Sequence, residues 1–507
     1  MPEARPGAVR LDPADNVAVS LADAAIGQAI HLEGRSVTIR EAIPAGHKLA
    51  LEAIDAAAPV IKFGQEIGRA SRPIHAGDWV HSHNLQSSLA PSGGPGAWRP
   101  GEMAGRAASP DAAAGQAPAF NGYLRPDGRV GIRNEIWILN TVGCVNQAAQ
   151  QIALEASRRH AGRCDGIFAF PHPYGCSQVG DDLDAIRRVL AGLARNPNAG
   201  GVLIIGLGCE NNQLAGLVRE TGAAGHNRLR YFNAQEVDDE IESGLACVAE
   251  LLDQLDDDRR VPVPLGALVL GVKCGGSDGF SSLTANPLVG RISDRVAAAG
   301  GSVVLSEVPE MFGAEALLFD RAADEEVHAR CVRLIEEFKA YFTGQGVAVD
   351  ENPSPGNLEG GITTLQEKSL GAVQKGGKQA PVRQVLNYGE QATEPGLVLL
   401  ESPGNDAVSS TALAASGATL ILFTTGRGTP LGFPVPTLKI ASNSDLARRK
   451  PRWIDFDAGA CLAAGSSPDV EAERLLALVR AVASGQRTRN EESGNREIAF
   501  WKRGVTL

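Results

Sequence analysis

An apolar run that ends abruptly in a polar, glycine-rich loop is the feature that most constrains the fold of this chain. Residues 269–272 read Val-Leu-Gly-Val, and residues 273–279 read Lys-Cys-Gly-Gly-Ser-Asp-Gly. The run is typical of a buried β-strand, and the loop lies at the carboxyl end of that strand, where open α/β sheets place their ligands. Because the loop carries an amine, a thiol, a hydroxyl and a carboxylate, it indicates a chemical site. A tight turn of solvated polar residues is the alternative.

The same alternation of apolar strand, polar loop and helix recurs along most of the 507 residues. It predicts parallel βαβ units. We expect strands at 136–139, 166–170, 202–205, 267–272, 302–305, 396–400 and 419–423, and helices at 147–156, 181–194 and 237–255. Residues 352–357 read as a loop without a helix.

The N-terminal part of the chain differs, because short β-rich segments separated by glycine and proline turns fill residues 14–90. Residues 91–121 are rich in Pro, Gly, Ala and Ser, which is typical of a linker. We therefore expect a multidomain α/β protein. It has a small all-β domain at 14–90, a linker at 91–121, and two Rossmann-like α/β portions at 122–262 and 263–507.

Composition excludes several classes of function. The net charge is −11 and there is no basic patch, so nucleic acid is not an expected partner. There is no long apolar run and no signal peptide, so we expect neither a membrane span nor export. The eight cysteines form no Cys-x-x-Cys pair, which favours reduced thiols in a cytoplasmic protein.

Glycine-rich loops raise the question of a nucleotide cofactor. The loop 206–211 reads Gly-Leu-Gly-Cys-Glu-Asn and lacks the third glycine of a dinucleotide fingerprint, and the loop 426–431 fails similarly. No phosphate-binding loop with Gly-Lys-Ser/Thr occurs either. We expect no nucleotide cofactor, although such loops can still bind a carboxylate at a helix N-terminus.

Candidate metal ligands fall into two groups. Cys144, Cys176, Cys209 and Cys274 stand beside glycines at expected strand ends, and they could be small core residues, metal ligands or ligands of an iron–sulfur cluster. The segment His81-Ser-His83 would place both imidazoles on one face of a strand, where they could share a divalent metal. A solvated histidine pair is the alternative.

Other residues suit proton transfer and anion binding. His47 precedes Lys48, and a neighbouring cation lowers the pKa of a histidine. Lys273 and Arg427 could hold a substrate carboxylate. The carboxylates of Glu210, Asp278, Glu307 and Glu310 follow expected strands and could serve as oxygen ligands of a metal. Ordinary ion pairs are the alternative for each of them.

Longer motifs resemble the altronate/galactarate dehydratase family from about residue 14 to Leu507. They include Gly46-His-Lys48, His172-Pro-Tyr-Gly-Cys-Ser-Gln178, Gly206-Leu-Gly-Cys-Glu-Asn-Asn-Gln213, Cys274-Gly-Gly-Ser-Asp-Gly279, Glu307-Val-Pro-Glu310, Asn352-Pro-Ser-Pro-Gly-Asn357 and Pro403-Gly-Asn-Asp406. The resemblance implies a β-clip, SAF-type N-terminal domain. It also implies dehydration of D-altronate to 2-dehydro-3-deoxy-D-gluconate, a step of hexuronate catabolism. The implied cofactor is a divalent metal, Fe(II) or alternatively Mn(II), in preference to an iron–sulfur cluster.

These arguments combine into one site hypothesis, in which the N-terminal domain closes over the sheet edge. We assign catalysis to His47, Lys48, Cys274 and Asp278, substrate binding to Lys273, Ser277, Asn286, Asn405 and Arg427, and metal binding to His81, His83, Cys176, Cys209 and Glu210. The expected partner is a small sugar acid, and a homo-oligomer is left open. The alternatives are a galactarate or other sugar-acid dehydratase, a related sulfo-lyase, and a sugar-acid binding protein without enzymatic activity.

Overall fold

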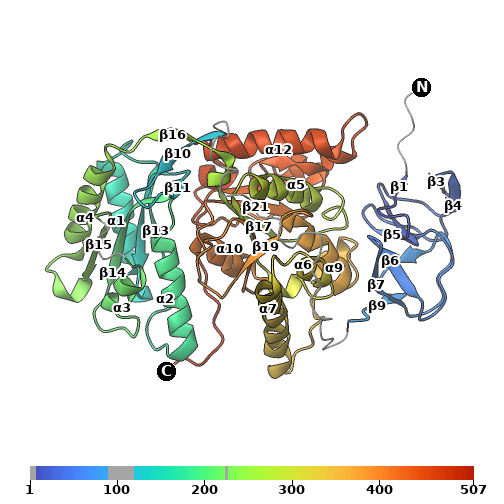
Figure 1. The fold of residues 1–507 in the computed structure, drawn as a ribbon, viewed down its shortest axis with the longest axis horizontal. Coiled ribbons are helices and arrows are strands. Elements are labelled where there is room, and N and C mark those ends of the chain that lie inside the picture. Colours follow the sequence, from blue (N-terminus) through green and yellow to red (C-terminus); the bar gives the residue numbers. More distant parts are fainter. Residues whose placement is uncertain (1–6, 90–118, 223–226) are drawn as a thin grey trace.

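The computed structural model describes residues 7–89, 119–222 and 227–507. Within these residues the chain forms three domains in a row, and the third domain lies between the other two (Figure 1). The expected linker falls almost entirely outside the described residues, and its last residues belong to a strand of the second domain. Among the described helices, none combines the length and the apolar content that a membrane crossing requires.

The first domain consists of short antiparallel strands in three small sheets. Its turns depend on glycines such as Gly77, where φ is +85° and a Cβ atom would lie 2.0 Å from the Thr38 carbonyl oxygen. The strands are β1 (Ala8–Val9), β2 (Val17–Ser20), β3 (Ala29–Leu32), β4 (Arg35–Thr38), β5 (Lys48–Ala50), β6 (Pro59–Lys62), β7 (Gln65–Ala70), β8 (Trp79–Val80) and β9 (Leu85–Gln86).

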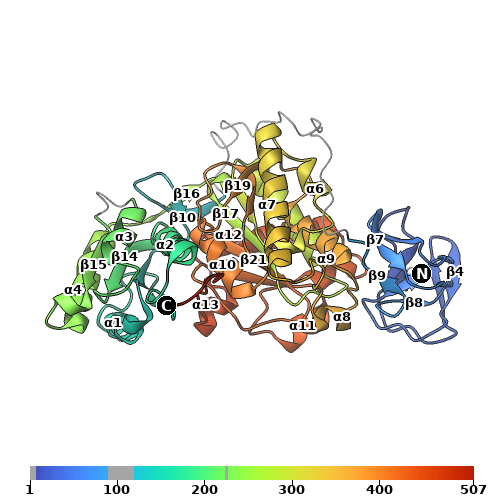
Figure 2. The same ribbon diagram turned by 90° about the horizontal axis from the view of Figure 1, so that it is seen from below.

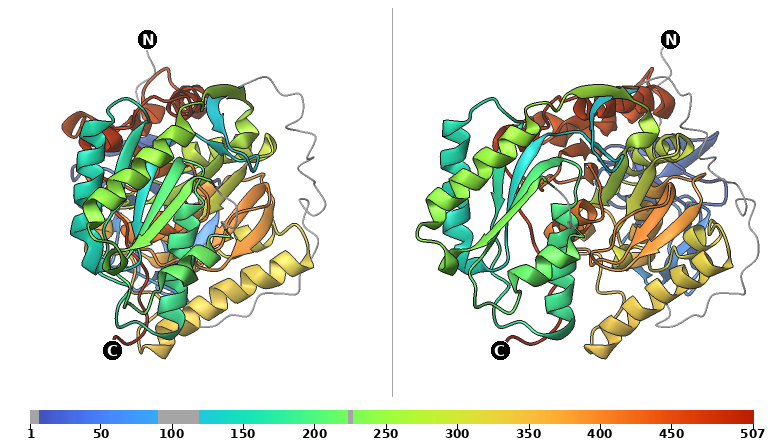
Figure 3. Two further views of the ribbon diagram at one scale, coloured as in Figure 1. Left: turned by 90° about the vertical axis from the view of Figure 1, so that its left-hand side faces the viewer. Right: turned by 60° about the vertical axis from the view of Figure 1, so that its left-hand side comes forward.

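The second domain has a parallel sheet in the order β13-β12-β14-β15 and a small antiparallel sheet β11-β10-β16. Helices α1 and α4 pack together on one face of the parallel sheet, and α2 lies on the other (Figure 3). The elements are β10 (Phe120–Leu124), β11 (Val130–Gly131), β12 (Glu135–Asn140), η2 (Gly143–Val145), α1 (Asn146–Arg159), β13 (Gly166–Phe170), α2 (Gly180–Ala194), β14 (Ala199–Gly206), α3 (Leu214–Glu220), β15 (Leu229–Asn233), η3 (Ala234–Glu236), α4 (Glu240–Leu255) and β16 (Arg260–Val263).

The third domain is built on a seven-stranded parallel sheet in the order β19-β20-β18-β17-β21-β22-β23. Its central strands are buried along their whole length, which explains their nearly continuous apolar sequences. The strands are β17 (Val269–Cys274), β18 (Ser302–Leu305), β19 (Val382–Leu386), β20 (Gly396–Leu400), β21 (Leu420–Thr425), β22 (Thr437–Ala441) and β23 (Phe456–Asp457). The helices are η4 (Leu265–Ala267), α5 (Ala285–Ala298), η5 (Val308–Glu310), α6 (Ala316–Phe319), α7 (Glu325–Gly344), α8 (Pro355–Glu359), α9 (Leu365–Ala372), η6 (Val373–Gly376), α10 (Asp406–Ala415), α11 (Ser444–Arg449), η7 (Ala458–Leu462), α12 (Pro468–Ala483) and α13 (Arg489–Ser493).

The structure confirms the multidomain α/β architecture with an all-β first domain. Two local predictions are wrong. Residues 352–357 are not all loop, because the capping box of Ser354 and Asn357 starts helix α8 at Pro355. His81 and His83 do not share a strand face, because β8 ends at Val80 and a turn follows. In that turn the Asn84 side chain accepts the His81 N–H at 2.9 Å and donates to the Trp79 carbonyl at 2.9 Å.

Candidate active site

A buried cluster of charged residues lies at the carboxyl ends of β17, β18 and β20. Lys273 Nζ lies 2.5 Å from Glu307 Oε1 and 2.9 Å from Asp406 Oδ1. Lys375 Nζ lies 3.2 Å from Glu307 Oε2 and 2.7 Å from the Sγ atom of Cys274. The Cys274 thiol in turn donates to Glu310 Oε2 at 3.1 Å.

Lys368 extends the cluster, because its Nζ atom lies 2.9 Å from Glu310 Oε1. The cluster therefore holds three ammonium groups and three carboxylates around one thiol. Charges taken out of water are tolerated only where they are paired and hydrogen-bonded, as they are here. Such a concentration of buried charge at a sheet edge is typical of a functional site.

Glu307 adopts an unusual backbone conformation, with φ +69° and ψ +56°. Residues other than glycine rarely adopt this left-handed region, and such strain concentrates at functional sites. The strained backbone aims the Glu307 carboxylate into the cluster, where it also accepts the Cys274 backbone N–H at 3.0 Å.

The protonation states follow from burial and neighbouring charge. Burial, reinforced by the Glu307 and Glu310 carboxylates, raises the pKa of Cys274 to about 12, so the thiol keeps its proton at neutral pH. Burial alone would raise the pKa of Glu310, but the ammonium groups of Lys368, Lys375 and Lys273 outweigh burial and lower it to about 2. Burial would lower the pKa of Lys273, and the carboxylates of Asp406 and Glu307 raise it instead. The pKa of Lys368 and that of Lys375 are also raised by neighbouring carboxylates against the effect of burial, so the three lysines and Glu310 are charged at neutral pH.

Solvent reaches the cluster from one side. The side chains of Lys273, Glu307 and Lys375 are at most 1% exposed, whereas Glu310, Lys368 and Asp406 are 6%, 9% and 32% exposed. A small molecule that enters the cluster would therefore contact Glu310, Lys368 and Asp406 first.

Two histidines of the first domain cap helix α8 of the third domain, which faces the first domain (Figure 2). His47 Nδ1 accepts a hydrogen bond from Trp79 Nε1 at 3.2 Å, so its Nε2–H donates to the Glu359 carbonyl at 3.2 Å. His81 Nε2 lies 3.0 Å from the Leu358 carbonyl, a contact that requires a donating N–H. These carbonyls lie in the last turn of α8, and the Leu358 carbonyl also accepts the backbone N–H of Gly361 at 2.9 Å.

Both imidazoles are neutral in this arrangement. Burial lowers the pKa of His47 to about 4, with smaller contributions from His81 and Lys48, and it also lowers the pKa of His81. The expected downward shift at His47 is confirmed, but burial rather than the neighbouring lysine is its main cause.

Lys48 joins the first domain to the third through a second buried network. Its Nζ atom donates to the Gly361 carbonyl, the Thr363 hydroxyl and Glu367 Oε2, each at 2.8 Å. Lys62 donates to the other oxygen of Glu367 at 2.8 Å. Burial lowers the pKa of Lys48 to about 8, and the Glu367 carboxylate opposes this shift. All three protons of the Lys48 ammonium are engaged, so Lys48 holds the two domains together.

The loop after Cys274 links these networks. The Asp278 carboxylate accepts from Ser442 at 2.7 Å and from Asn443 at 2.9 Å, so Asp278 fixes the loop. The Ser277 carbonyl accepts from the Asn357 side chain of α8 at 2.8 Å. Asn357 also accepts from Lys368 at 3.1 Å. Helix α8, which the histidines cap, is therefore connected directly to the charged cluster.

Other residues predicted to bind substrate have structural partners. Asn286 bonds the Gly371 carbonyl at 3.0 Å and the Thr424 hydroxyl at 2.6 Å. Asn405 caps helix α10 through the backbone N–H groups of Ala407 and Val408, next to Asp406 of the cluster. Arg427 is half exposed and pairs with Glu359 at 2.9 Å.

The predicted metal ligands do not come together in this chain. His81 and His83 belong to the first domain, whereas Cys176, Cys209 and Glu210 belong to the second, and the third domain lies between them (Figure 1). Glu210 is buried and accepts from Thr141 and from the backbone N–H groups of Leu207 and Gly208, so it shapes its own loop. The described residues bring together a different donor set, Cys274, Glu307 and Glu310, whose ligand atoms lie within 4.8 Å of one another.

This donor set fits a divalent metal in chemistry and in charge. A thiolate with two carboxylates suits Fe(II) or Mn(II). The three carboxylates and three ammonium groups already balance, so a dication would be balanced by loss of the Cys274 proton and by one carboxylate of a bound acid. The ammonium groups of the three lysines, which now bind the oxygens of Glu307 and Glu310, would have to move to make room for the metal ion.

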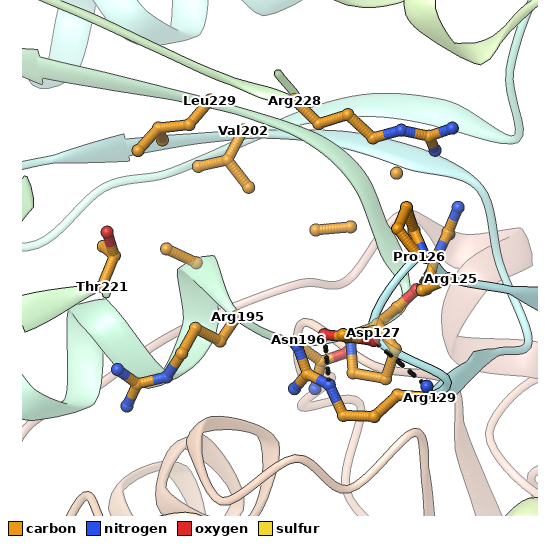
Figure 4. Close-up of a pocket in the computed structure, with 14 residues that line it drawn as sticks. Arg125, Pro126, Asp127, Arg129, Arg195, Asn196, Val202, Thr221, Arg228 and Leu229 are labelled. Carbon is orange, nitrogen blue, oxygen red and sulfur yellow. Dashed lines mark hydrogen bonds and ion pairs between the residues drawn. The ribbon is translucent and has the colours of Figure 1, made fainter. Parts of the chain in front are cut away.

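A separate arginine-lined pocket lies at the amino-terminal end of β14 (Figure 4). Arg228 and Arg125 both pair with Asp258, and Arg129 pairs with Asp127. These guanidinium groups already have carboxylate partners, and the pocket lies at the end of the sheet opposite the strand-end loops. It is therefore not the candidate active site.

The sequence did not single out Lys368, Lys375 or Asp406 as site residues. Lys368 and Lys375 come from α9 and η6 rather than from a strand end. Their spacing of seven residues, which places two side chains on one helical face, was the available signal.

Comparisons with known proteins agree with this architecture. Three family models match the chain: "Altronate/galactarate dehydratase SAF domain" at residues 6–88, "D-galactarate dehydratase/Altronate hydrolase, second domain" at 122–256, and "D-galactarate/Altronate dehydratase, C-terminal" at 265–506. The chain belongs to the altronate/galactarate dehydratase family, and it is a hydro-lyase.

Within that family the chain is most like the altronate dehydratases. It is 46% identical to the altronate dehydratase of Escherichia coli (strain K12), over 98% of this chain and 99% of that protein. It is 43% identical to the altronate dehydratase of Bacillus subtilis (strain 168), with the same coverage. Identity to the galactarate dehydratase (L-threo-forming) of Escherichia coli is 33%, over 94% of this chain and 93% of that protein.

Proposed function

We propose that this protein dehydrates D-altronate to 2-dehydro-3-deoxy-D-gluconate at the charged cluster of the third domain. Similarity to two altronate dehydratases along nearly the whole chain supports the choice of substrate. The observation that carries the site is the set of three buried ammonium groups and three carboxylates around Cys274.

Dehydration of a 2,3-dihydroxy acid requires removal of the C2 proton, departure of the C3 hydroxyl, and stabilisation of the negative charge that develops on the carboxylate side. Pre-positioned ammonium groups in a site that excludes water stabilise such charge strongly. Lys273 and Lys375, both fully buried, would stabilise the enediolate. The resulting enol becomes the 2-keto product by proton transfer to C3.

Glu310 and Lys368 are the proposed proton-transfer pair, because they form an ion pair at 2.9 Å on the accessible side of the cluster. In this proposal the ionised Glu310 accepts the C2 proton. Lys368 donates a proton to the leaving hydroxyl. Cys274 supports Glu310 through its thiol proton.

We also propose that a divalent cation, Fe(II) or Mn(II), is held by Cys274, Glu307 and Glu310. Such a cation supplies Lewis-acid polarisation of a substrate oxygen when it is bound. The side chains described above still position the substrate and move the protons.

The first domain has a positioning role in this proposal. His47 and His81 fix the end of α8, and α8 holds Lys368 through Asn357. Lys48 fixes the same region through Glu367. The first domain thus acts on the site through α8 and α9.

A coupled assay for 2-keto-3-deoxy acids, run with altronate, other aldonates and galactarate, tests the proposal. Each acid is tested with Fe(II), with Mn(II) and after removal of metals by a chelator. We expect turnover of altronate that is restored by one of the two metals. Turnover of galactarate alone would overturn the substrate assignment, and binding of altronate without a keto product would favour a binding protein.

A further inference from the structure

The second domain carries three exposed cysteines at the carboxyl ends of adjacent parallel strands. Cys144 follows β12, Cys176 follows β13 and Cys209 follows β14, and the order of these strands in the sheet is β13-β12-β14. All three thiols are exposed, whereas the other five cysteines are buried or half-buried. Unpaired cysteines are among the most buried residues of proteins, so three exposed thiols at one sheet edge call for an explanation.

Hydrogen bonds hold the three loops against one another. The backbone N–H of Gly143, next to Cys144, donates to the Tyr174 carbonyl at 2.9 Å. The N–H of Ser177, next to Cys176, donates to the Asn211 side chain at 2.8 Å, and Asn211 lies two residues after Cys209. Each cysteine is therefore within two residues of a bond that joins its loop to a neighbouring one.

A glycine precedes each of the three cysteines, and close packing requires it in each case. A Cβ atom at Gly143 would lie 2.8 Å from the His172 carbonyl oxygen, and one at Gly175 would lie 2.0 Å from the Thr141 carbonyl oxygen. At Gly208, where φ is +127°, it would lie 2.8 Å from Gln235. The glycines let the loops that carry the three cysteines pack closely at this edge of the sheet.

We propose that Cys144, Cys176 and Cys209 bind an iron–sulfur cluster of the four-iron type, with one iron that has no cysteine ligand and faces solvent. A single zinc ion explains the arrangement less well. Thiolates on one zinc ion stand only about 3.8 Å apart, because each Zn–S bond is about 2.3 Å. The three thiols do not form a group within 4.8 Å among the described residues. The cysteines of a four-iron cluster bind different iron atoms and stand farther apart.

The local electrostatics suit an anionic cluster. Cys144 lies in η2, which leads directly into the 14-residue helix α1. Cys176 lies four residues before the 15-residue helix α2. Helix N-termini stabilise thiolates and other anions.

Assembly of the cluster balances in atoms and charge. Two Fe(II), two Fe(III) and four sulfide ions give a core of charge +2, and each cysteine thiol releases one proton as its sulfur binds iron. This site is separate from the charged cluster of the third domain, and the inference does not depend on the proposed function.

The test is anaerobic reconstitution of the full chain with ferrous and ferric iron and sulfide, followed by desalting. We expect about four acid-labile sulfide ions per chain, about four iron ions in addition to any Fe(II) at the third-domain site, and visible absorption near roughly 400 nm. Each of Cys144→Ser, Cys176→Ser and Cys209→Ser should lose most of this absorption. Cys247→Ser, in α4 of the same domain, and Cys274→Ser, in the third domain, should keep it. Binding of zinc without sulfide, or serine variants that keep the absorption, would overturn the proposal.

Two measurements on the unaltered chain need no variant. Alkylation followed by mass spectrometry should label Cys144, Cys176 and Cys209 in the chain without iron and should spare all three after reconstitution. One-electron oxidation by ferricyanide should release one Fe(II) and leave a paramagnetic three-iron cluster, since one iron lacks a protein ligand. Equal labelling before and after reconstitution would contradict the proposed ligands, and a cluster that keeps all its iron would contradict the open position.

Discussion

The second and third domains present the carboxyl ends of parallel strands in two chemically opposite ways. In the second domain a glycine precedes each cysteine, and the thiols of Cys144, Cys176 and Cys209 are exposed. In the third domain the glycines follow Cys274, which is the last residue of β17 and is buried among charged groups. Two sheets with parallel strands thus present exposed thiols at one edge and buried ion pairs at the other.

The two edges also differ in what covers them. The first domain docks on the third through Lys48 and Lys62, and both of these lysines are buried against Glu367. The edge of the second domain is approached by the C-terminal segment, where Leu507 N–H donates to the Ser177 carbonyl at 2.9 Å. A whole folded domain therefore covers the third-domain edge, whereas only the C-terminal segment of the third domain approaches the second-domain edge.

The largest expected effect concerns proton transfer at the charged cluster of the third domain. Glu310→Gln should lower kcat by about 10²–10⁴-fold, because it removes the proposed base while keeping the shape of the side chain. It should leave the acid-labile sulfide content and the visible absorption of the second domain unchanged. The measurements are formation of 2-keto-3-deoxy acid and analysis of acid-labile sulfide on one preparation.

Glu315→Gln is the matched control, since Glu315 pairs with Lys339 outside the cluster. Normal turnover of altronate by Glu310→Gln would rule out Glu310 as the base. Loss of the second-domain absorption in this variant would show that the two edges are not separate sites.

A second prediction concerns the docking of the first domain on the third. Lys48→Met should weaken docking of the first domain by about 3–5 kcal/mol, because Glu367 then remains buried with one partner fewer. Hydrogen exchange should increase in α8 and α9 and stay unchanged around Cys144, Cys176 and Cys209. The surface pair of Arg40 and Asp78 provides the control, since Arg40→Met should cost at most about 1 kcal/mol. Unchanged exchange in α8 after Lys48→Met would mean that the buried pair does not hold the domains together.

A third prediction concerns pH. The pKa of His47 is lowered from 6.5 to about 4 by burial, so the undocked first domain binds more protons than the docked one between these values. Docking should therefore weaken as pH falls from 6.5 towards 4. The Glu367 carboxylate, whose pKa is lowered to about 2 by Lys48 and Lys62 against the opposing effect of burial, adds a further loss below pH 4.5.

Tryptophan fluorescence can follow this change, because Trp79 contacts both His47 and His81. His47→Gln should reduce the part of the transition above pH 4.5, since glutamine does not titrate. A transition of the same size in that variant would assign the effect to other groups.

The smallest expected effect shows whether His81 caps helix α8 or acts directly on the substrate. His81→Gln can still donate to the Leu358 carbonyl, so it should lower kcat only a few-fold, whereas His81→Ala removes this link between the domains and should lower kcat further. Equal losses in both variants would indicate that the imidazole itself acts on the substrate.

The strands of the third-domain sheet could be predicted because buried parallel strands are nearly continuous apolar runs. Residues 302–305 and 396–400 match β18 and β20. The turn after β8 could not be predicted, because the Asn84 side chain ends the strand through local hydrogen bonds that no apolar pattern records.

The candidate site could be predicted in part. Lys273 and Cys274 stand at a strand end, so their place at the sheet edge followed from the alternation of strand and loop. Lys368 and Lys375 reach the same place from a helical segment about a hundred residues later in the chain. Only tertiary packing brings them there, and one sequence does not contain that information. The roles assigned to the individual residues stay predictions.

The buried bond between Lys48 and Glu367 has a consequence for biosynthesis. The two residues are 319 positions apart in the chain. At about 5–20 residues per second, a ribosome needs roughly 15–60 s to proceed from the first to the second. During that interval the first domain has to remain folded with Lys48 and Lys62 in water, and a chaperone or a second nascent chain could bind its open face. Docking is therefore a late step in maturation, and the speed of translation from Lys48 to Glu367, which includes the whole second domain, sets how long that face stays available.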